Sequence, residues 1–327
     1  MTANPTLQLK KKVAPFEKSS FKRSLVQILN TVPPFMLLWF LAYQSLEVSY
    51  WLTLALSVAA AGFAIRIFIL FHDCCHYALF KNRRANEMIG TLTGILTFTP
   101  YRGWQHSHAI HHATSSNLNK RGIGDIRVLT VEEYTQSTFW QRLAYRLYRN
   151  PLVMFGLGPF YSFLLGNRFN RKGAKFKERV NTYLTNTGIV ALVALLCWAV
   201  GWQALLLVHL PIFYLSSALG IWMFYVQHQF EDTYFENENE WDFVKAAVDG
   251  SSYYKLPRLL QWVTGNIGFH HVHHLSPRVP NYYLEQAHEQ TPDFRKVTTI
   301  TLKSSLQALR FRLWDEKNKR FVGFREI

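Results

Sequence analysis

Long uncharged apolar stretches alternate with basic segments along the chain. Ser24 to Leu46 carries no charge, and Val48 to Phe71 carries only Arg66. Val180 to Phe230 contains no Asp, Glu, Lys or Arg and is long enough for two passes, divided near Gly201 and Trp202. A membrane-spanning helix needs about 20 such residues, because its backbone polar groups must bond within the segment. The pattern predicts four transmembrane helices in two hairpins, residues 24–71 and 180–230.

Each hairpin returns the chain to the side on which it started. The N-terminal tail 1–23, the segment 72–179 and the segment 231–327 are therefore expected on one side. These segments carry nearly all Lys and Arg, which the positive-inside rule assigns to the cytoplasm. The sequence predicts an all-α membrane protein with both termini cytoplasmic and a helical cytoplasmic cap. Two shorter apolar stretches, Met88–Tyr101 and Asn150–Asn167, are expected at the membrane interface.

Composition agrees with a membrane protein. Lys and Arg outnumber Asp and Glu by 36 to 21, a net charge of +15 that fits nucleic acid, an anionic membrane surface or an acidic protein. No nucleic-acid-binding motif accompanies the charge, so we expect the membrane and no nucleic acid. The cysteines Cys74, Cys75 and Cys197 are too few for a disulfide framework, and we interpret them as reduced packing residues.

Ten of the thirteen histidines fall into three short clusters. Side chains three or four positions apart share one face of a helix, so each cluster directs several imidazoles toward a common point. The predicted topology brings all three clusters to the same side of the membrane. His228, at the end of the fourth span, is expected to join them. The clusters are His72-Asp-Cys-Cys-His76, His106-Ser-His108-Ala-Ile-His111-His112 and His270-His271-Val-His273-His274.

Eight or nine imidazoles exceed what one four-coordinate zinc uses, and they suit two metals of higher coordination number. Iron fits such a site if its role is to activate oxygen. A carboxylate-type di-iron centre would need two Glu-x-x-His motifs. The chain has one, Glu285-Gln-Ala-His288.

With this order of HxxxH, HxxHH and HxxHH boxes between paired spans, the chain resembles the membrane fatty acid desaturases. Within the family, HDCCH, the run from His108 to Asp125 and the run from His270 to Asn281 look like the acyl-lipid desaturases of Bacillus-type bacteria, which act at carbon five (delta-5) of phospholipid acyl chains. The resemblance implies a di-iron site whose ligands are the eight box histidines together with the extra histidine after the last span: His72, His76, His108, His111, His112, His228, His270, His273 and His274.

The same resemblance implies the cofactors and partners. Two iron ions would use O2 and two external electrons to remove two hydrogens from an acyl chain held in an apolar tunnel. The chain carries no haem or flavin motif, so a ferredoxin- or flavodoxin-type donor would supply the electrons, and the basic cytoplasmic face suits an acidic donor. The expected location is the plasma membrane, and the expected substrate is a membrane phospholipid.

Several further residues have two interpretations. Asn266 could hold a water at a metal, and Asp73 could fix an imidazole tautomer or simply end a helix. His106 and His271 are expected beside the ligands or in solvent, with a role as metal ligands as the alternative. His209 is expected as a hydrogen-bonded packing residue. Arg66 is expected to extend to the interface. Trp104 and Asp125 are expected to line the acyl tunnel, to support ligands, or to pack in loops.

Three rival functions remain at this point. A hydroxylase of the same superfamily would carry the same boxes, and only the mass of the product would separate it from a desaturase. A membrane metal carrier would need polar residues through its spans, and these spans are nearly bare. A membrane-anchored sensor would need a separate signalling domain, which the sequence does not show.

Overall fold

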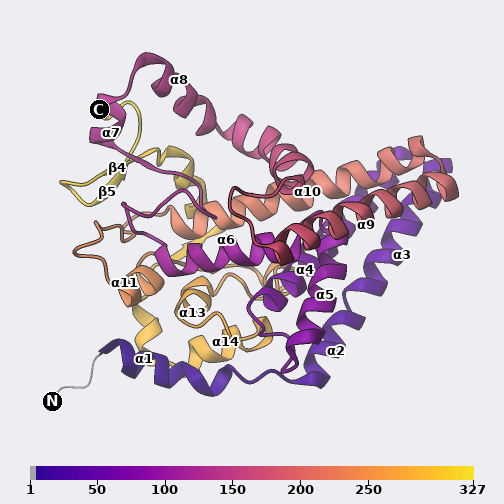
Figure 1. The fold of residues 1–327 in the computed structure, drawn as a ribbon, viewed down its shortest axis with the longest axis horizontal. Coiled ribbons are helices and arrows are strands. Elements are labelled where there is room, and N and C mark those ends of the chain that lie inside the picture. Colours follow the sequence, from indigo (N-terminus) through magenta and orange to yellow (C-terminus); the bar gives the residue numbers. More distant parts are fainter. Residues whose placement is uncertain (1–4) are drawn as a thin grey trace.

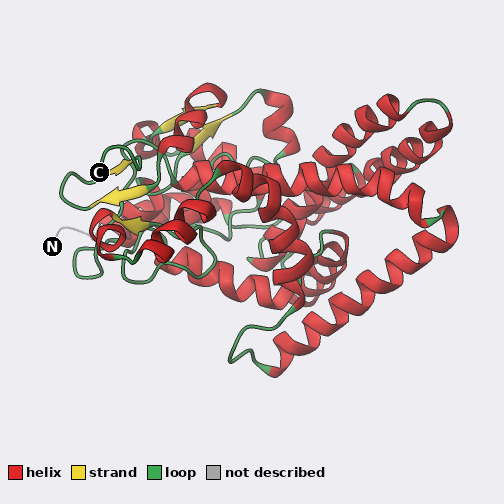
Figure 2. Cartoon of the chain, turned by 90° about the horizontal axis from the view of Figure 1, so that it is seen from above, coloured by secondary structure: helices red, strands yellow, loops and turns green. Residues whose placement is uncertain are grey.

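The long helices reach one end of the molecule, and shorter elements are gathered at the other (Figure 1 and Figure 2). This computed structural model describes residues 5–327, so the first four residues of the expected tail 1–23 lie outside it. The four segments long and apolar enough to cross a membrane are Phe21–Glu47, Tyr50–Cys75, Phe176–Val200 and Trp202–His228. The prediction of four spanning helices in a predominantly helical protein is confirmed.

Proline and glycine set the ends of these helices. The first span consists of α2 (Phe21–Leu29) and α3 (Val32–Gln44), followed by the turn η2 (Ser45–Glu47). α3 restarts with proline in its first turn, where the missing N–H costs nothing. Between α9 (Phe176–Val200) and α10 (Trp202–His228), Gly201 has φ +82°, which ends one helix and reverses the chain.

The long helices expose apolar side chains on their outer surface. The side chain of Trp51 on α4 (Tyr50–Cys75) is 81% exposed and that of Trp198 on α9 is 84% exposed. Large apolar patches of this kind are rare on soluble monomers. α4 lies among the others and packs against α3, α10 and α5 (Arg83–Leu96). The outer helices therefore present an apolar surface suited to lipid.

The remaining segments build the cap. α1 (Pro5–Val13) and the turn η1 (Ala14–Phe16) precede the first span. Between the hairpins the structure has α5, α6 (Tyr101–Thr114), α7 (Val131–Gln136), α8 (Phe139–Tyr148), the π-helical turns η3 (Leu152–Leu157) and η4 (Phe160–Leu165), and η5 (Gly166–Arg168). After the second hairpin it has α11 (Phe243–Val248), α12 (Arg258–Val263), α13 (His270–Leu275), α14 (Asn281–Gln290), η6 (Pro292–Lys296), α15 (Leu302–Ser305) and η7 (Leu306–Arg310).

Five short strands, which the sequence pattern did not predict, fasten distant parts of the cap together. β1 (Leu129–Thr130) pairs in parallel with β4 (Leu313–Asp315), and β4 pairs antiparallel with β5 (Arg320–Val322). β2 (Tyr253–Lys255) pairs in parallel with β3 (Thr299–Thr301). The C-terminal segment is thereby joined to the segment between the hairpins.

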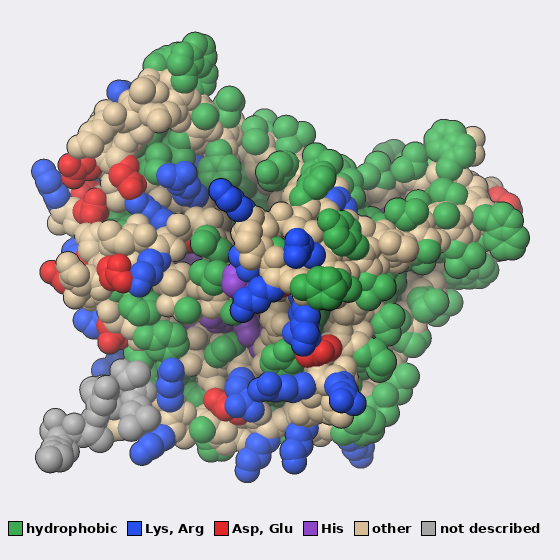
Figure 3. Space-filling view, in the orientation of Figure 1, with side chains coloured by type: hydrophobic (Ala, Val, Ile, Leu, Met, Phe, Trp, Pro, Cys, Tyr) green, Lys and Arg blue, Asp and Glu red, His purple; other side chains and the backbone are tan. Residues whose placement is uncertain are grey.

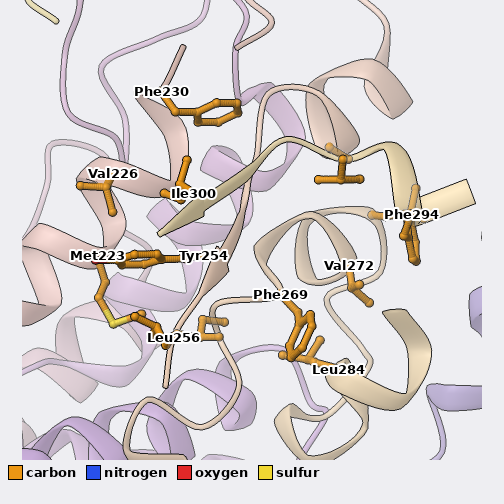
Figure 4. Packing of buried hydrophobic residues seen from close by; sticks show 14 of the residues in the cluster. Met223, Val226, Phe230, Tyr254, Leu256, Phe269, Val272, Leu284, Phe294 and Ile300 are labelled. Atoms are coloured by element: carbon orange, nitrogen blue, oxygen red, sulfur yellow. The ribbon is translucent and has the colours of Figure 1, made fainter. Parts of the chain in front are cut away.

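The main core of the cap surrounds α13. Phe269, Val272 and Leu284 pack with Phe294 on one side, while the end of α10 contributes Met223 and Val226 to the same cluster (Figure 4). Val272 is fully buried at the centre of the third histidine box. This packing fixes the direction in which the histidines of α13 point.

Candidate metal centre

Four elements deliver the histidines to one region of the cap. His72 lies in the last turn of α4 and His76 caps that helix, while α6 carries the second box. His228 is the last residue of α10, and α13 carries the third box. All nine of the expected ligand residues belong to this region. Histidine side chains are visible at the base of a hollow in the surface (Figure 3).

Two glycines allow the surrounding backbone to approach these helices. In the turn before α13, Gly265 has φ +53°, and a Cβ there would lie 2.7 Å from the side chain of Ile69 on α4. Gly124 has φ +74°, and a Cβ there would lie 2.6 Å from the carbonyl oxygen of Ser107 on α6. Only glycine adopts these positive φ values without cost and fits such close contacts.

The imidazoles form two groups that do not follow the three boxes. Within the first cluster, each histidine contributes one ring nitrogen, and these nitrogens all lie within 4.8 Å of one another. The same holds within the second cluster. His270 adjoins the second cluster, because its Nε2 lies 3.0 Å from Nε2 of His228. The first cluster consists of His72, His76, His108, His112 and His273, and the second consists of His111, His228 and His274.

One ring nitrogen lies within hydrogen-bond distance of two others, which neutral imidazoles alone do not explain. Nε2 of His108 lies 3.0 Å from Nε2 of His72 and 3.1 Å from Nε2 of His112. Nε2 of His111 lies 3.2 Å from Nε2 of His228. A neutral imidazole has one donor and one acceptor nitrogen, so a single nitrogen cannot pair well with two others. Lone pairs that converge in this way are suited to a shared cation.

Many of the remaining ring nitrogens are buried without a partner. Buried polar groups in proteins are almost always hydrogen-bonded, so this concentration of exceptions calls for an explanation. Metal ions would provide a partner for Nε2 of His76, His273 and His274, whereas the Nδ1 atoms belong to rings whose Nε2 is the converging nitrogen. The convergence of one ring nitrogen from each histidine makes both clusters able to bind metal. The unpartnered atoms are Nδ1 of His72, His111, His112 and His270 and Nε2 of His76, His273 and His274.

Burial also keeps the imidazoles neutral. It lowers the pKa of His108 and His273 well below the usual range of histidine, and the neighbouring imidazoles lower the pKa of both further. The same causes lower the pKa of His76, His111, His112, His270 and His274. His76 differs from the other histidines of the two clusters because it is only partly buried. Neutral imidazoles are the form that binds metals.

Asp73 lies in a hydrogen-bond network behind the first cluster. Its Oδ2 accepts from the backbone N (2.8 Å) and the side-chain Nδ2 (2.9 Å) of Asn281. Its Oδ1 lies 3.6 Å from Nδ1 of His72, which is too long for a hydrogen bond. Asn281 also exchanges amide hydrogen bonds with Gln27 and accepts from Nδ2 of Asn266. This network ties α2, α4 and α14 together beside His72.

Asn281 and Gln27 were not expected at the site. Their side chains are hydrogen-bonded to each other although the two residues are 254 positions apart in the sequence. Asn281 directly follows Pro280 at the start of α14, and the third box ends only a few residues earlier. That position was a signal for Asn281. Nothing in the apolar first span marked Gln27.

A large apolar cavity reaches the first cluster. Its volume is about 590 Å³, within the range of small-molecule binding sites. His108 lies in its wall, and the ring of Trp104 stacks on His108 with centroids 4.0 Å apart. Asp125 also lines the cavity, so both residues considered for an acyl tunnel lie at its wall. Much of the remaining wall is aromatic or aliphatic, with Phe35, Phe68, Leu96, Phe98, Phe213 and Phe224 among its residues.

Apart from His270, four histidines stand outside the two clusters: His106, His209, His271 and His288. Nδ1 of His106 lies 3.7 Å from Oε1 of Glu178 on α9. Nε2 of His271 lies 2.9 Å from Nδ1 of His288. His209 lines the apolar cavity next to Phe98, and its Nδ1 has no hydrogen-bond partner among residues 5–327. The expectation that His209 is a hydrogen-bonded packing residue is therefore wrong.

The expectation for Arg66 also needs correction. This residue is only 5% exposed, and its guanidinium lies 3.8 Å from the centre of the Trp262 ring. Its Nε donates to Oγ1 of Thr31 at 3.2 Å, and its Nη1 donates to the carbonyl oxygen of Trp262. These partners hold the side chain inside the protein, where it joins α4 to α12 and to Thr31.

The chain is similar to several known proteins. The sequence model of a family described as fatty acid desaturase matches residues 49–300. A fatty acid desaturase of Bacillus subtilis is 64% identical over 325 residues, which cover 99% of this chain and 92% of that protein. A chloroplastic omega-6 fatty acid desaturase of Arabidopsis thaliana is 28% identical over 74% of this chain and 54% of its own. A Synechocystis protein named sn-1 acyl-lipid omega-3 desaturase (ferredoxin) is 26% identical over 68% of this chain and 62% of its own.

Proposed function

The chain belongs to the fatty acid desaturase family, and on this basis we propose that it introduces a double bond into an acyl chain of a membrane phospholipid. The enzyme class is that of an oxidoreductase. The observation that supports the substrate class best is the apolar cavity, which leads to the first histidine cluster at His108. An acyl chain is the apolar ligand that such a cavity favours.

We propose that the nine expected histidines hold two iron ions. The support is the convergence of their buried ring nitrogens and the lack of any carboxylate in the two clusters among the residues described. Bound iron would supply the oxygen-dependent oxidation of the acyl chain. The protein holds the imidazoles neutral and fixes their direction through the packing of α4, α6, α10 and α13.

The chain's own residues would position the substrate and exclude water. Phe68 and Trp104 lie in the cavity wall with ring centroids 5.6 Å apart, and Phe68 also packs against Phe71. A rigid aromatic wall holds a flexible chain near the cluster and removes water from the reacting carbons. The shape of the cavity would then select which carbons lie next to His108. The resemblance to Bacillus-type enzymes favours carbon five.

The electron donor and the location are parts of the same proposal. An external carrier of ferredoxin or flavodoxin type fits the net charge of +15, because such carriers are acidic. The related Synechocystis protein is named with ferredoxin. We place the four spans in the plasma membrane with both termini and the cap in the cytoplasm, on the grounds of the distribution of Lys and Arg.

Expression in a host whose lipids are saturated tests this function. We expect new phospholipid acyl chains that are lighter by two hydrogens, and fragmentation of the chains would locate the double bond. His111→Ala should abolish the product. His106→Ala should retain it, because His106 lies outside both clusters and its side chain is 36% exposed. A gain of one oxygen in place of the loss of two hydrogens would indicate a hydroxylase instead.

A further inference from the structure

A second, much smaller cavity lies beside the second histidine cluster. Its volume is about 20 Å³, and His111 and His228 form part of its wall. Ser116, Arg121 and Asp125 line it as well. A polar cavity larger than about 10–15 Å³ has room for one water molecule. This cavity therefore has the size and the polarity to hold a single water.

Two of the residues around this cavity have polar atoms without a hydrogen-bond partner among residues 5–327. Ser116 is 6% exposed, and its Oγ makes no hydrogen bond. Nη1 of Arg121 is also buried without a partner, while Nη2 of the same side chain pairs with Glu133. Buried polar atoms of this kind are usually bonded to protein or to an ordered water. One water in the cavity would give both atoms a partner.

The small cavity and the acyl cavity meet the metal centre from different directions. The acyl cavity includes His108 of the first cluster, whereas the small cavity includes His111 and His228 of the second. Asp125, Ile126 and Phe224 line both cavities. These three residues therefore form the wall between an apolar space and a polar one.

The proposed reaction needs protons as well as electrons. A saturated pair of methylenes, one O2, two electrons and two protons give one double bond and two waters. The two protons come from solvent, because the substrate's own hydrogens are already counted in the waters. An acyl chain that fills the large cavity excludes water from that direction. Solvent reaches the first cluster at the partly exposed His76, but the second cluster is entirely buried and needs a polar approach of its own.

Polar side chains connect the small cavity to the surface. The side chain of Arg121 is 14% exposed and that of its partner Glu133 is 42% exposed. The guanidinium of Arg121 keeps its proton, so it holds a water and does not relay protons itself. Protons would reach that water by exchange with solvent beside Glu133 and pass from it to the second cluster. We propose that the cavity binds one ordered water, held by Ser116 and Arg121, and that this water admits the protons consumed when oxygen is reduced. The inference rests on the proposed desaturase function.

Substitution of Ser116 tests the site. Ser116→Ala removes the hydroxyl that holds the water, and we expect turnover to fall roughly 100-fold, the lower end of the loss typical of a positioned proton transfer. The solvent deuterium isotope effect on turnover should rise, because proton entry becomes rate-limiting. Arg121→Met removes the other partner of the water. It should lower turnover and raise the solvent isotope effect in the same way. Iron content and melting temperature should stay at the wild-type values.

Ser57→Ala is the matched control. Ser57 is fully buried on α4, its Oγ also lacks a partner, and it lines neither cavity. We expect wild-type turnover and isotope effect from this variant. A readout that does not depend on activity is an experimental density map of the zinc-loaded protein, in which one water should lie between Ser116 and Arg121 and disappear in Ser116→Ala.

The inference is wrong if the wild-type map shows no water there, or if both Ser116→Ala and Arg121→Met fold with iron and keep wild-type turnover and isotope effect. Failure of the desaturase function itself would look different. In that case the iron-loaded wild-type protein would form no double bond with any donor, whatever residue stood at position 116.

Discussion

The two histidine clusters differ in their surroundings. The first cluster borders the apolar cavity through His108. Among the residues described, His76 is the one member of this cluster that is partly exposed. The second cluster is entirely buried and borders a polar cavity with room for one water. In the second cluster Nδ1 of His228 lies 3.1 Å from the carbonyl oxygen of Gly250, a backbone contact that fixes the ring. One cluster thus borders the proposed acyl cavity, and the other borders the proposed water site.

This division runs through the boxes rather than between them. His111 and His112 are neighbours on α6 but belong to different clusters, and so do His273 and His274 on α13. Successive side chains on a helix point about 100° apart, because a turn takes 3.6 residues. A box can therefore serve both clusters at once. The rings of His112 and His274 stack 4.2 Å apart and hold the clusters side by side.

The largest expected effect separates two adjacent residues. His273→Ala removes a side chain of the first cluster, and His274→Ala removes one of the second. We expect each variant to lose activity by at least about 100-fold, because loss of a ligand costs more than the 10- to 100-fold typical of its outer partners. Each variant should keep about one iron, measured by elemental analysis, where the wild type keeps about two.

The matched control is His271→Ala, which lies in the same box but outside both clusters, with its Nε2 facing His288. This variant should keep both irons. If His273→Ala and His274→Ala each lost all bound metal, or neither lost any, the two clusters would not act as separate sites.

Acid should act on both clusters in the same direction. Burial lowers the pKa of His108 in the first cluster and of His274 in the second, well below the value of about 6.5 expected in the unfolded chain. As pH falls below about 6.5, the unfolded state binds protons that the folded state does not. The free energy of unfolding of the metal-free protein should then fall by up to about 1.4 kcal/mol per pH unit for each such histidine.

Thermal unfolding of the metal-free protein from about pH 8 to about pH 5.5 measures this effect. Asp and Glu contribute little in that range, because their unfolded pKa values lie near 4. We expect a constant melting temperature above about pH 7 and a steady decrease below it. A melting temperature that rose as the pH fell would show that the imidazoles are charged in the folded protein.

Much of this arrangement could be predicted from the sequence, and the reasons are physical. The uncharged run from Val180 to Phe230 predicts two spans because no other structure buries so long an apolar segment. The spacing of His108, His111 and His112 predicts a shared helical face. The assignment of each ring to a cluster could not be predicted, because it depends on how α6, α10 and α13 pack against one another. The buried Arg66 was missed because its partners Thr31 and Trp262 are distant in sequence.

A larger side chain in the wall of the acyl cavity tests whether the acyl chain of the substrate lies in that cavity. Gly220 on α10 lines the cavity, and a Cβ there would meet nothing within 4 Å, so Gly220→Leu places a side chain in open space. We expect product formation to fall roughly tenfold or to shift to shorter acyl chains, since a lost fit of a few methylenes is worth about 1–3 kcal/mol. Lipid analysis measures both outcomes.

Gly156→Leu is the control for this change. Its Cβ would also meet nothing within 4 Å, but Gly156 does not line the cavity. Both variants should bind wild-type amounts of iron. An unchanged product pattern from Gly220→Leu would show that the acyl chain lies elsewhere.

The smallest expected effect concerns the exposed edge of the first cluster. His76 is followed by Tyr77, and the guanidinium carbon of the exposed Arg83 lies 5.2 Å from the centre of the Tyr77 ring. If an acidic donor delivers electrons to this edge, Arg83→Glu should slow donor-dependent turnover several-fold at low salt. Raising the ionic strength from about 0.05 to about 0.5 M should shrink the difference in turnover between Arg83→Glu and the wild type, because screening shortens the range of the attraction.

Arg320→Glu is the control. It reverses a charge that is 61% exposed on β5 and should have little effect on turnover. Turnover driven by a chemical reductant should be the same in the wild type and in both variants. Equal losses from Arg83→Glu and Arg320→Glu would mean that the donor responds to the net charge of the protein, and that the exposure of His76 does not mark where electrons enter.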